Sequence, residues 1–497
     1  MVSLLVTGQN QCQFKTYQKV KGVQMYGIVA YGAYIPVYRL SREVMNNTWG
    51  GGAGRGEKAV ANWDEDSLTM AVEAGRTCLT GMDKGSVDAL YFATTTPPYK
   101  EKQSASIIAA ALDLDENIVA ADFTNSVRSG TIALRAALDA VKAGSAKNVL
   151  VIAADCRMAA PNSALEPVLA DGAAALLVGK DEVAVEIEGS HYLTSEFMDV
   201  WRLEYDRIIR IWEDRFILEE GYLKILPKAI STLLKAHGLS TKDFSKTAFY
   251  ALDGRSHGAM VKKLGLDAKT QVQDPLFDRV GNTGAAYAPM MLVGALEEAK
   301  PGDRILWANY GDGADAHVLR VGEGIEKIRD GRSLSKQIQS KFMLENYGKY
   351  IKFRGLMEFE QNYEYRTRTS LPLIWRDRNW VYRFHGHKCQ KCGKVQFPLQ
   401  KACMYCQARE EFLDEVPLQD KTGTLFTFSM DERVPVVDPP NVVAAVSLDG
   451  GGRFFSQMTD RVPENVKVGM PMELTFRRIT EALGVHNYFW KCKPARD

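Results

Sequence analysis

Four cysteines in the last third of the chain have the spacing of a metal site. They form two Cys-x2-Cys pairs, Cys389 with Cys392 and Cys403 with Cys406, and ten residues separate the pairs. Two such pairs can place four thiolates around one tetrahedral Zn²⁺. Because four thiolates fill the coordination shell, the spacing predicts a structural zinc ribbon, or a structural site for another metal. A ribbon that has lost its metal is the alternative.

A second stretch, residues 124–144, has the pattern of a turn between a strand and a helix. It follows an apolar run, 118–123, that predicts a buried strand, and apolar residues then recur at helical spacing up to Gly144. Many acyl-transfer enzymes place a nucleophile at such a turn. This turn contains no cysteine. Ser126 remains an alternative nucleophile, although it has no base near it in the sequence.

Composition limits what the rest of the chain can be. With 497 residues, two to four domains are expected, and 46% apolar and 25% charged residues are typical of a globular protein. The net charge of +1 makes nucleic acid an unfavourable partner. No apolar run approaches the roughly 20 residues of a membrane helix. Four scattered cysteines beside the clustered four fit a reducing cytoplasm. Residues 1–24 lack a secretory signal and are interpreted as an extension.

The elements that must position these residues alternate between strand and helix. Strands are predicted at 27–35, 89–94, 149–154, 172–177 and 248–252, and helices at 66–79, 103–112, 216–237 and 256–264. The turn at Asn125, its helix and the next strand have an echo that begins at Asn282, and an Asp-Gly pair follows each copy. Two similar halves indicate internal duplication about a pseudo-twofold axis. Two unrelated α/β units are the alternative. A site between related halves would be lined by both turns.

The end of the chain differs in pattern. Residues 322–370 are charged and rich in tyrosine, which suits a connector. After the cysteine pairs, short strands are predicted at 423–430, 441–448, 453–458 and 472–478. Short alternating strands separated by turn residues predict a small β-barrel of the OB kind.

Short motifs run through residues 25–322: Gly130-Thr131, Ala153-Ala-Asp155, Glu166-Pro, Asp171-Gly-Ala, Trp212-Glu-x-Arg-Phe, Lys262-Lys-Leu-Gly, Gly281-Asn-Thr283 and Tyr310-Gly-x-Gly313. Together they resemble the 3-hydroxy-3-methylglutaryl-CoA synthases of the thiolase superfamily. Residues from about 370 to 495 resemble the small acyl-CoA-associated proteins (DUF35) that pair a zinc ribbon with an OB fold. The resemblance implies an α/β protein with duplicated, thiolase-like α-β-α-β-α layers, followed by a zinc ribbon and a small OB-type barrel. It also implies a coenzyme A thioester as substrate or ligand.

This resemblance divides the chain into six parts. They are an N-terminal extension (1–24), two thiolase-like halves (25–182 and 183–322), a connector (323–370), the zinc ribbon (371–415) and the OB fold (416–497).

The three catalytic side chains of the synthase family are not retained. The resemblance places Val127 at the position of the cysteine nucleophile, Tyr250 at that of the histidine and Thr95 at that of the glutamate base. The family's asparagine is retained as Asn282, and the serine of its Tyr-Gly-x-Gly loop becomes Asp312. Without a thiolate, the covalent acyl-enzyme of the family is not expected.

Two further assignments depend on the same resemblance. A shift of the alignment by one residue puts Ser126 at the nucleophile's position. Arg255, Lys262 and Lys263 lie where the family's lysines bind the CoA phosphates, and a solvated helix face is the alternative for them.

Tyr250 and Asp312 are predicted to form an acid–base pair. This resembles the thiolase-fold steroid side-chain aldolases, which lack the cysteine, use tyrosines and need a DUF35 partner. The predicted function is therefore formation or cleavage of a carbon–carbon bond in a β-hydroxy- or β-keto-acyl-CoA. One alternative is a non-catalytic or accessory subunit of a thiolase complex, which contributes a CoA channel through its DUF35 domain. A CoA-binding protein with a regulatory role is the other.

The expected partners follow from the same resemblance. Acyl-CoA is the expected small-molecule ligand, and the fold implies a homodimer or a hetero-oligomer with a thiolase subunit. Neither nucleic acid nor a membrane is an expected partner.

Overall fold

The protein is described from a computed structural model, which covers residues 24–329, 333–357 and 370–496. Its largest element is a nine-stranded sheet in the order β11-β12-β13-β8-β1-β7-β6-β4-β5. The strands are β1 (Gly27–Tyr34), β4 (Ala89–Thr94), β5 (Val119–Thr124), β6 (Asn148–Cys156), β7 (Asp171–Gly179), β8 (Val185–Thr194), β11 (Lys246–Phe249), β12 (Arg304–Tyr310) and β13 (Gly313–Val321). The two halves of this sheet join where β1 pairs with β8 over two residues, so each half carries one copy of the duplicated unit.

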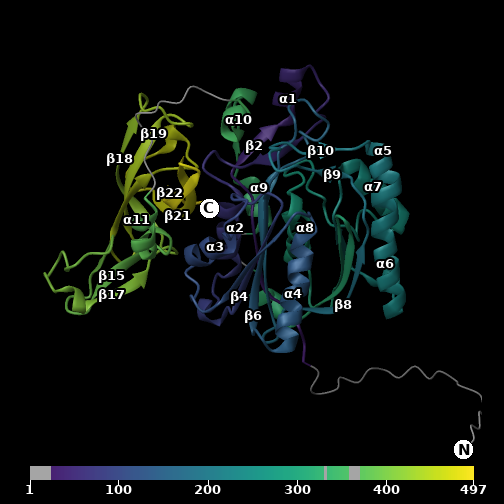
Figure 1. Cartoon of the computed structure of the whole chain (residues 1–497), viewed down its shortest axis with the longest axis horizontal. Coiled ribbons are helices and arrows are strands. Elements are labelled where there is room, and N and C mark those ends of the chain that lie inside the picture. The colour runs from purple at the N-terminus through teal and green to yellow at the C-terminus, as the bar shows by residue number, and fades with distance from the viewer. Residues whose placement is uncertain (1–23, 330–332, 358–369, 497) are drawn as a thin grey trace, which may run out of the picture.

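Helices separate the two halves of the sheet and cover their outer faces. They are α2 (Ser67–Cys78), α3 (Ser104–Ala111), α4 (Ser129–Ala143), α6 (Leu223–His237), α7 (Gly254–Leu264) and α8 (Tyr287–Glu298). Figure 1 shows α4 and α8 in the middle, α2 and α3 on one side, and α6 and α7 on the other. Helix α8 is buried from Tyr287 to Leu296 because it packs against strands of both halves. The predicted duplicated α-β-α-β-α layering is therefore confirmed.

Strand β5 is not the buried strand that its apolar sequence predicts. Among the described strands it is the outermost of the sheet, and β4 is its one described partner. Val119 is 62% exposed, and the other residues of β5 are half-buried or exposed. An apolar run shows that a strand packs on a face, but it does not show whether another strand covers its edge.

The long helix predicted at 216–237 is interrupted. It consists of α5 (Asp214–Phe216), a π-helical turn (Ile217–Tyr222) and α6. A Cβ at Gly221 in this turn would lie 2.5 Å from the Phe197 ring and 2.7 Å from the Tyr310 hydroxyl. Turns of this kind are frequent at functional sites, because the extra residue re-aims the side chains of the helix.

A small second sheet joins part of the predicted connector to the N-terminal half. Its order is β14-β2-β3. The elements are β2 (Tyr38–Ser41), α1 (Arg42–Trp49), β3 (Glu57–Val60), α9 (Leu334–Gln339), β14 (Phe342–Met343) and α10 (Tyr347–Arg354). Tyr347, Tyr350 and Phe353 of α10 are buried against β2 and β3. The described part of the connector is thus packed, while residues 358–369 lie outside the described ranges.

The C-terminal part contains a ribbon and a five-stranded barrel, at the side of α2 and α3 (Figure 1). The elements are α11 (Leu371–Arg376), α12 (Arg378–Val381), β15 (His385–Cys389), β16 (Val395–Gln396), β17 (Leu413–Pro417), β18 (Gly423–Asp431), β19 (Asn441–Leu448), β20 (Arg453–Gln457), β21 (Pro471–Ala482) and β22 (Val485–Pro494). The barrel strands have the order β20-β19-β18-β21-β22. The predicted OB-type domain is confirmed.

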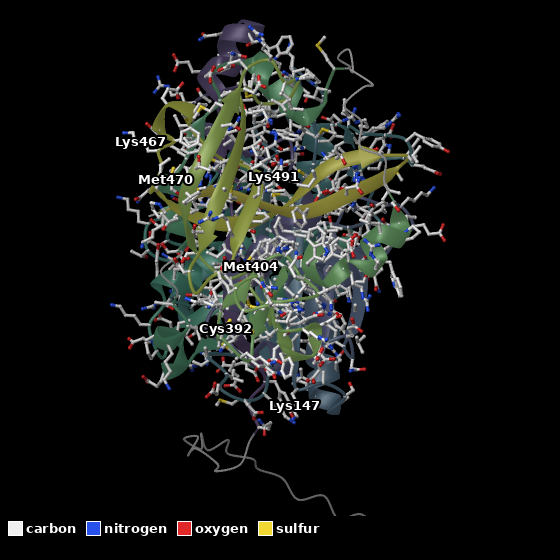
Figure 2. All side chains as sticks on the ribbon, turned by 90° about the vertical axis from the view of Figure 1, so that its left-hand side faces the viewer. Lys147, Cys392, Met404, Lys467, Met470 and Lys491 are labelled. Atoms are coloured by element: carbon white, nitrogen blue, oxygen red, sulfur yellow. The ribbon has the colours of Figure 1, made fainter. Side chains whose placement is uncertain are left out.

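A buried network of ion pairs joins the barrel to the first half. Arg477 of β21 is fully buried and pairs with Glu65 at 2.5 Å, Asp460 at 2.6 Å and Asp64 at 3.4 Å. Lys491 of β22 pairs with Asp64 at 2.9 Å. Figure 2 shows Lys491 among the barrel strands, with Cys392 below them. Within the described ranges, every helix is too short or too polar to span a lipid bilayer.

Candidate functional site

A cavity of about 80 Å³ is lined by residues of both duplicated halves. Its inner end is lined by buried side chains, among them Val127 of the first turn, Tyr250 after β11 and Asn282 before α8. Its mouth is bordered by exposed residues, Asp214 and Arg255. The side chains between the two ends are mostly apolar. The cavity therefore combines buried polar groups, exposed polar groups and a mostly apolar remainder.

Four residues singled out in the sequence meet at this cavity: Val127, Tyr250, Arg255 and Asn282. Val127 and Asn282 belong to corresponding turns of the duplicated unit, so both turns line the site. The Ile217 and Leu218 side chains of the π-helical turn complete the wall.

Tyr250 is positioned as a hydrogen-bond donor. Its hydroxyl accepts from Asn282 Nδ2 at 3.2 Å, and Asn282 Nδ2 also donates to the Ala251 carbonyl at 3.0 Å. Burial raises the pKa of Tyr250 above 10.0, although the Arg157 guanidinium and the Asn282 amide act in the opposite direction. The phenol therefore keeps its proton at neutral pH, and that proton is available to a ligand in the cavity.

A carboxylate that the sequence did not single out also lines the cavity. Asp199 is buried, and its Oδ1 accepts from the Val200 N–H at 2.6 Å. Burial raises the pKa of Asp199, and hydrogen bonds from Val200 and the Tyr310 hydroxyl lower it. Asp199 lies in a stretch with little regular structure, so no periodic pattern marks it, whereas Tyr310 belongs to the Tyr-Gly-x-Gly motif.

Asp312 does not line the cavity. Its side chain is exposed, and its backbone has a φ of 48° in the turn between β12 and β13. The structure thus brings Asp199 to the cavity beside Tyr250, and it does not bring Asp312 there. The sequence alone does not distinguish these carboxylates, because which of them is buried depends on the assembled fold.

A second buried carboxylate, Asp155 at the end of β6, organises the loops around the site. It accepts from the Thr94 and Thr96 hydroxyls at 2.9 Å, from Thr95 N–H at 2.7 Å and Thr95 hydroxyl at 2.9 Å, and from Ala285 N–H at 2.8 Å. Thr95 therefore donates hydrogen bonds to Asp155, and it does not line the cavity. These bonds fix the end of β4 against the second turn.

The remaining predicted site residues lie outside the cavity. The Ser126 hydroxyl accepts from the Arg128 N–H at 3.2 Å, and no described basic side chain hydrogen-bonds to it. Lys262 and Lys263 are exposed in the last turn of α7. Lys263 borders a separate surface groove, which also includes Lys224.

Among the described residues, no cysteine or histidine lines the cavity. Cys78 is buried in α2, where burial raises the pKa of its thiol to about 12. Cys156 lies 3.0 Å from the Arg354 guanidinium, and burial raises its pKa too. Neither thiol lines the cavity. No described residue of the C-terminal ribbon or barrel lines the cavity either.

A second cavity of about 240 Å³ adjoins the first, and Ala164 lines both. Its walls include Trp49, glycines of the 50–54 loop and Ser163. The Ser163 hydroxyl is buried and has no hydrogen-bond partner in the described structure. Trp49 is 38% exposed, so part of its ring faces this space.

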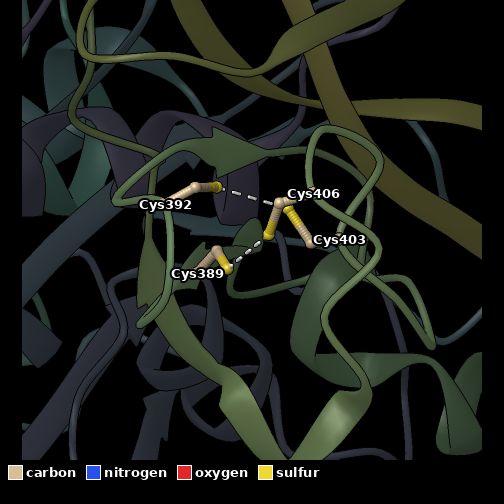
Figure 3. A group of neighbouring side chains, drawn as sticks. All are labelled: Cys389, Cys392, Cys403 and Cys406. Carbon is tan, nitrogen blue, oxygen red and sulfur yellow. Dashed lines mark hydrogen bonds between the residues drawn. The ribbon is translucent and has the colours of Figure 1, made fainter.

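The four predicted metal ligands gather in the ribbon. Figure 3 shows their side chains pointing toward one another. All four Sγ atoms lie within 4.8 Å of one another, and Cys389–Cys406 and Cys392–Cys403 are each 3.6 Å apart. A tetrahedron with Zn–S bonds of ~2.3 Å has S–S edges of roughly 3.8 Å. The thiols are too far apart for disulfides, and their arrangement fits a tetrahedral metal.

Comparison with known proteins gives the family. The chain is 34% identical over 342 residues to a hydroxymethylglutaryl-CoA synthase of Methanosphaera stadtmanae, which covers 67% of this chain and 99% of that protein. A hydroxymethylglutaryl-CoA synthase of Methanopyrus kandleri is 33% identical over 344 residues, 67% of this chain and 98% of that protein. This chain belongs to the hydroxymethylglutaryl-CoA synthase family.

Domain families and solved structures agree with this placement. Residues 121–196 and 234–321 match the families described as 3-oxoacyl-[acyl-carrier-protein] synthase III and its C-terminal part. A synthase of the family solved with CoA superposes with a TM-score of 0.62 at 20% identity, over 70% of this chain and 94% of that one. At that identity, the likeness shows the fold alone.

The family relatives leave about a third of the chain unmatched. Residues 415–477 match the family described as the C-terminal OB-fold domain of ChsH2. The protein is thus a fusion of a synthase-family fold with a DUF35-like C-terminal part.

Proposed function

We propose that this protein binds an acyl-CoA thioester in the cavity and forms or cleaves a carbon–carbon bond without an acyl-enzyme. The main support is that Val127, Tyr250 and Asn282 line the buried end of the cavity, and that Arg255 lies at its exposed mouth. Two relatives in the same fold support it, because one was solved with CoA and another with 3-hydroxy-3-methylglutaryl-CoA. An apolar channel with few polar groups suits a pantetheine arm.

The nucleotide end of the ligand would lie outside this channel. Arg255 at the mouth, with Lys262 and Lys263 further along α7, provides cations for the phosphates. The adjoining cavity supplies the partly exposed Trp49 ring and the unpartnered Ser163 hydroxyl. An adenine base could stack on the first and hydrogen-bond with the second.

The proposed reaction on a β-hydroxyacyl-CoA uses two groups at the inner end. Asp199 takes the proton of the β-hydroxyl group, a carbonyl forms at the β-carbon, and the Cα–Cβ bond breaks. The electron pair moves into the thioester as an enolate, whose oxygen accepts a hydrogen bond from Tyr250. The proton held by Asp199 then returns to the α-carbon. Products are a carbonyl compound and a shortened acyl-CoA, and the reverse sequence forms the bond.

The test is turnover by the purified full-length chain. A panel of β-hydroxyacyl-CoA substrates should yield equimolar carbonyl product and shortened acyl-CoA, detected by mass spectrometry. Tyr250→Phe should lower kcat by roughly 100-fold or more, because the enolate loses its donor. Turnover that appears only after addition of a separate thiolase would favour the accessory-subunit alternative. Failure of CoA and acyl-CoA to bind would overturn the proposal.

We also propose a structural Zn²⁺ on the four ribbon cysteines. The 3.6 Å Sγ spacings support it, and four thiolates leave no open position for catalysis. Elemental analysis should find one zinc per chain in the wild type and none in Cys403→Ser. A zinc content far below one in protein purified without chelators would contradict the assignment.

A homodimer, or a hetero-oligomer with a thiolase, remains the proposed assembly. The uncovered edge of β5 supports it, because an edge strand leaves N–H and C=O groups free to pair with another chain. Light scattering on the purified chain distinguishes a monomer from a dimer. A monomer that shifts to a complex only with a thiolase favours the hetero-oligomer.

A further inference from the structure

Arg157, directly after β6, is buried at the inner end of the cavity without an acidic partner. It is 7% exposed and lines the cavity with Val127, Tyr250 and Asn282. No carboxylate among the described residues lies within ion-pair distance of its guanidinium. Burial raises the pKa of the Tyr250 phenol, and the nearby charge of Arg157 opposes that rise. A buried guanidinium without a counter-charge is costly unless a ligand supplies one.

The other buried arginines of the described chain show that this is unusual for the molecule. Each of them has a carboxylate within 4.0 Å: Arg39 has Glu57, Arg42 has Asp278, Arg128 has Asp315, Arg461 has Asp438, and Arg477 has three acids. Arg157 alone among these described buried arginines lacks such a pair. Since five of six follow the rule, the exception indicates a function other than stability.

The nearest acids are already engaged. Asp155, two residues away, accepts its five hydrogen bonds from other groups. Asp199 accepts from the Val200 N–H and from the Tyr310 hydroxyl. A Cβ at Gly284 would lie 2.2 Å from Asp155 Oδ2 and 2.7 Å from Arg157 Cδ, so a glycine is required for the arginine stem to pass this carboxylate.

A second arginine adds to the positive charge near this point. The Arg202 guanidinium donates to the Thr95 carbonyl, at the loop that Asp155 holds. Burial lowers the pKa of Arg202, the Asp155 carboxylate opposes this shift, and the charge of Arg157 adds to it, so the two guanidinium groups repel each other across a site that Asp155 only partly neutralises. An anion that entered the inner end would relieve this repulsion.

We propose that Arg157 binds a negatively charged oxygen on the acyl part of the thioester. This inference rests on the proposed function, because it takes the thioester to occupy the cavity. The anion is either a permanent carboxylate of the acyl group or the enolate oxygen formed in the reaction. The phosphates of CoA are not the target, because Arg157 lies at the buried end and Arg255 at the exposed mouth. A guanidinium suits both anions, since it donates two parallel N–H bonds.

The experiment measures the affinity of the full-length protein by calorimetry for matched pairs of ligands. Glutaryl-CoA is compared with pentanoyl-CoA to test a permanent carboxylate. Carboxymethyl-CoA, an enolate mimic, is compared with its neutral amide, carbamoylmethyl-CoA. The charged member of at least one pair should bind about 10-fold or more tightly than the neutral one. Preference within the first pair identifies a carboxylate-bearing acyl group, and preference within the second pair alone identifies the enolate.

Variants then assign the preference to Arg157. Arg157→Gln should remove it while affinity for CoA itself changes less than about 3-fold, and Arg157→Lys should retain part of it. The matched control, Arg255→Gln, should weaken CoA and every acyl-CoA alike and leave the preference intact. If Arg157→Gln does not fold, the affinities of the wild-type protein and of Arg157→Lys for the same ligand pairs still test whether Arg157 binds the anion.

Two outcomes would overturn the inference. Equal affinity for the charged and neutral members of both pairs, with CoA bound, refutes the role of Arg157 and leaves the proposed function standing. A preference that survives unchanged in Arg157→Gln has the same consequence. Absence of CoA binding to the wild-type protein would instead refute the proposed function, and this inference with it.

Discussion

Two regions of this protein bury charged groups, and they treat those groups differently. At the interface between the barrel and the first half, Arg477 contacts three carboxylates and Lys491 shares one of them. At the inner end of the cavity, Arg157 has no described acid partner and the Tyr250 proton faces open space. The contrast shows how to separate structural from functional charge. A buried charge whose partners are complete holds the fold together, and one whose partners are missing awaits a ligand.

The largest effect is expected at the interface. Arg477→Ala leaves Glu65 buried without its cation, while Asp64 keeps Lys491 and Asp460 keeps Arg496, so the free energy of unfolding should fall by about 3 kcal/mol. Chemical denaturation measures the change. Arg157→Met is the comparison, because it removes a buried guanidinium that has no acid partner among the described residues.

Removal of the unpaired Arg157 should affect stability in the opposite direction from removal of the paired Arg477. Arg157→Met should keep or raise the stability, since it removes an uncompensated buried charge. If Arg157→Met and Arg477→Ala cost the same, the distinction between the two regions is wrong.

A smaller effect is expected where the cavity is held in shape. Gly284 has a φ of 62°, and a Cβ there would overlap Asp155 and Arg157. Gly284→Ala should cost about 1–3 kcal/mol and weaken acyl-CoA binding in the same preparation. Gly302→Ala is the control, because Gly302 has a φ of 90° and nothing within 4 Å of its Cβ position. Equal effects on acyl-CoA affinity in both variants would refute a local role for Gly284.

The Tyr250 hydroxyl should matter little for stability. In Tyr250→Phe, Asn282 keeps its hydrogen bond to the Ala251 carbonyl, so the cost should stay below about 1 kcal/mol. The same variant should lose roughly 100-fold in turnover. Thermal unfolding followed in parallel with the assay checks both. A large loss of stability with little loss of turnover would make Tyr250 a structural residue.

The smallest effect is a pH dependence at a partly exposed pair of the interface. His385 Nε2 lies 2.8 Å from Asp113; burial acts to lower the pKa of His385, but the Asp113 and Glu415 carboxylates raise it above its usual value. Since the folded pKa lies above the unfolded one, the pair stabilises fully below about pH 6.5 and loses this stabilisation as pH rises through the folded pKa. The contribution should be about 0.5–1 kcal/mol.

Unfolding of the wild type and of His385→Gln at pH 5.5 and pH 8.5 measures this contribution. The difference between the two proteins should be larger at pH 5.5. A difference that is equal at both pH values, or larger at pH 8.5, would contradict the assignment.

Much of the fold could be predicted because its signals are local. The two Cys-x2-Cys pairs predict the ribbon. The similarity between the segments that begin at Asn125 and Asn282 predicts the duplication. The edge position of β5 could not be predicted, because the number of strands beside it depends on the assembled sheet. The carboxylate that lines the cavity could not be predicted either, because it also depends on the assembled fold. Asp199 carries no motif, and only the folded chain shows that Asp312 is exposed.

The sequence by itself determined that the turn at residues 124–131 contains no cysteine, because residue types do not depend on folding. It also determined the family, the duplicated plan and the four thiols of the ribbon. Only the tertiary structure decided which charges are paired. Pairing depends on distances between residues far apart in the chain, such as Arg477 and Asp64, and on the lack of such a partner at Arg157 within the described structure.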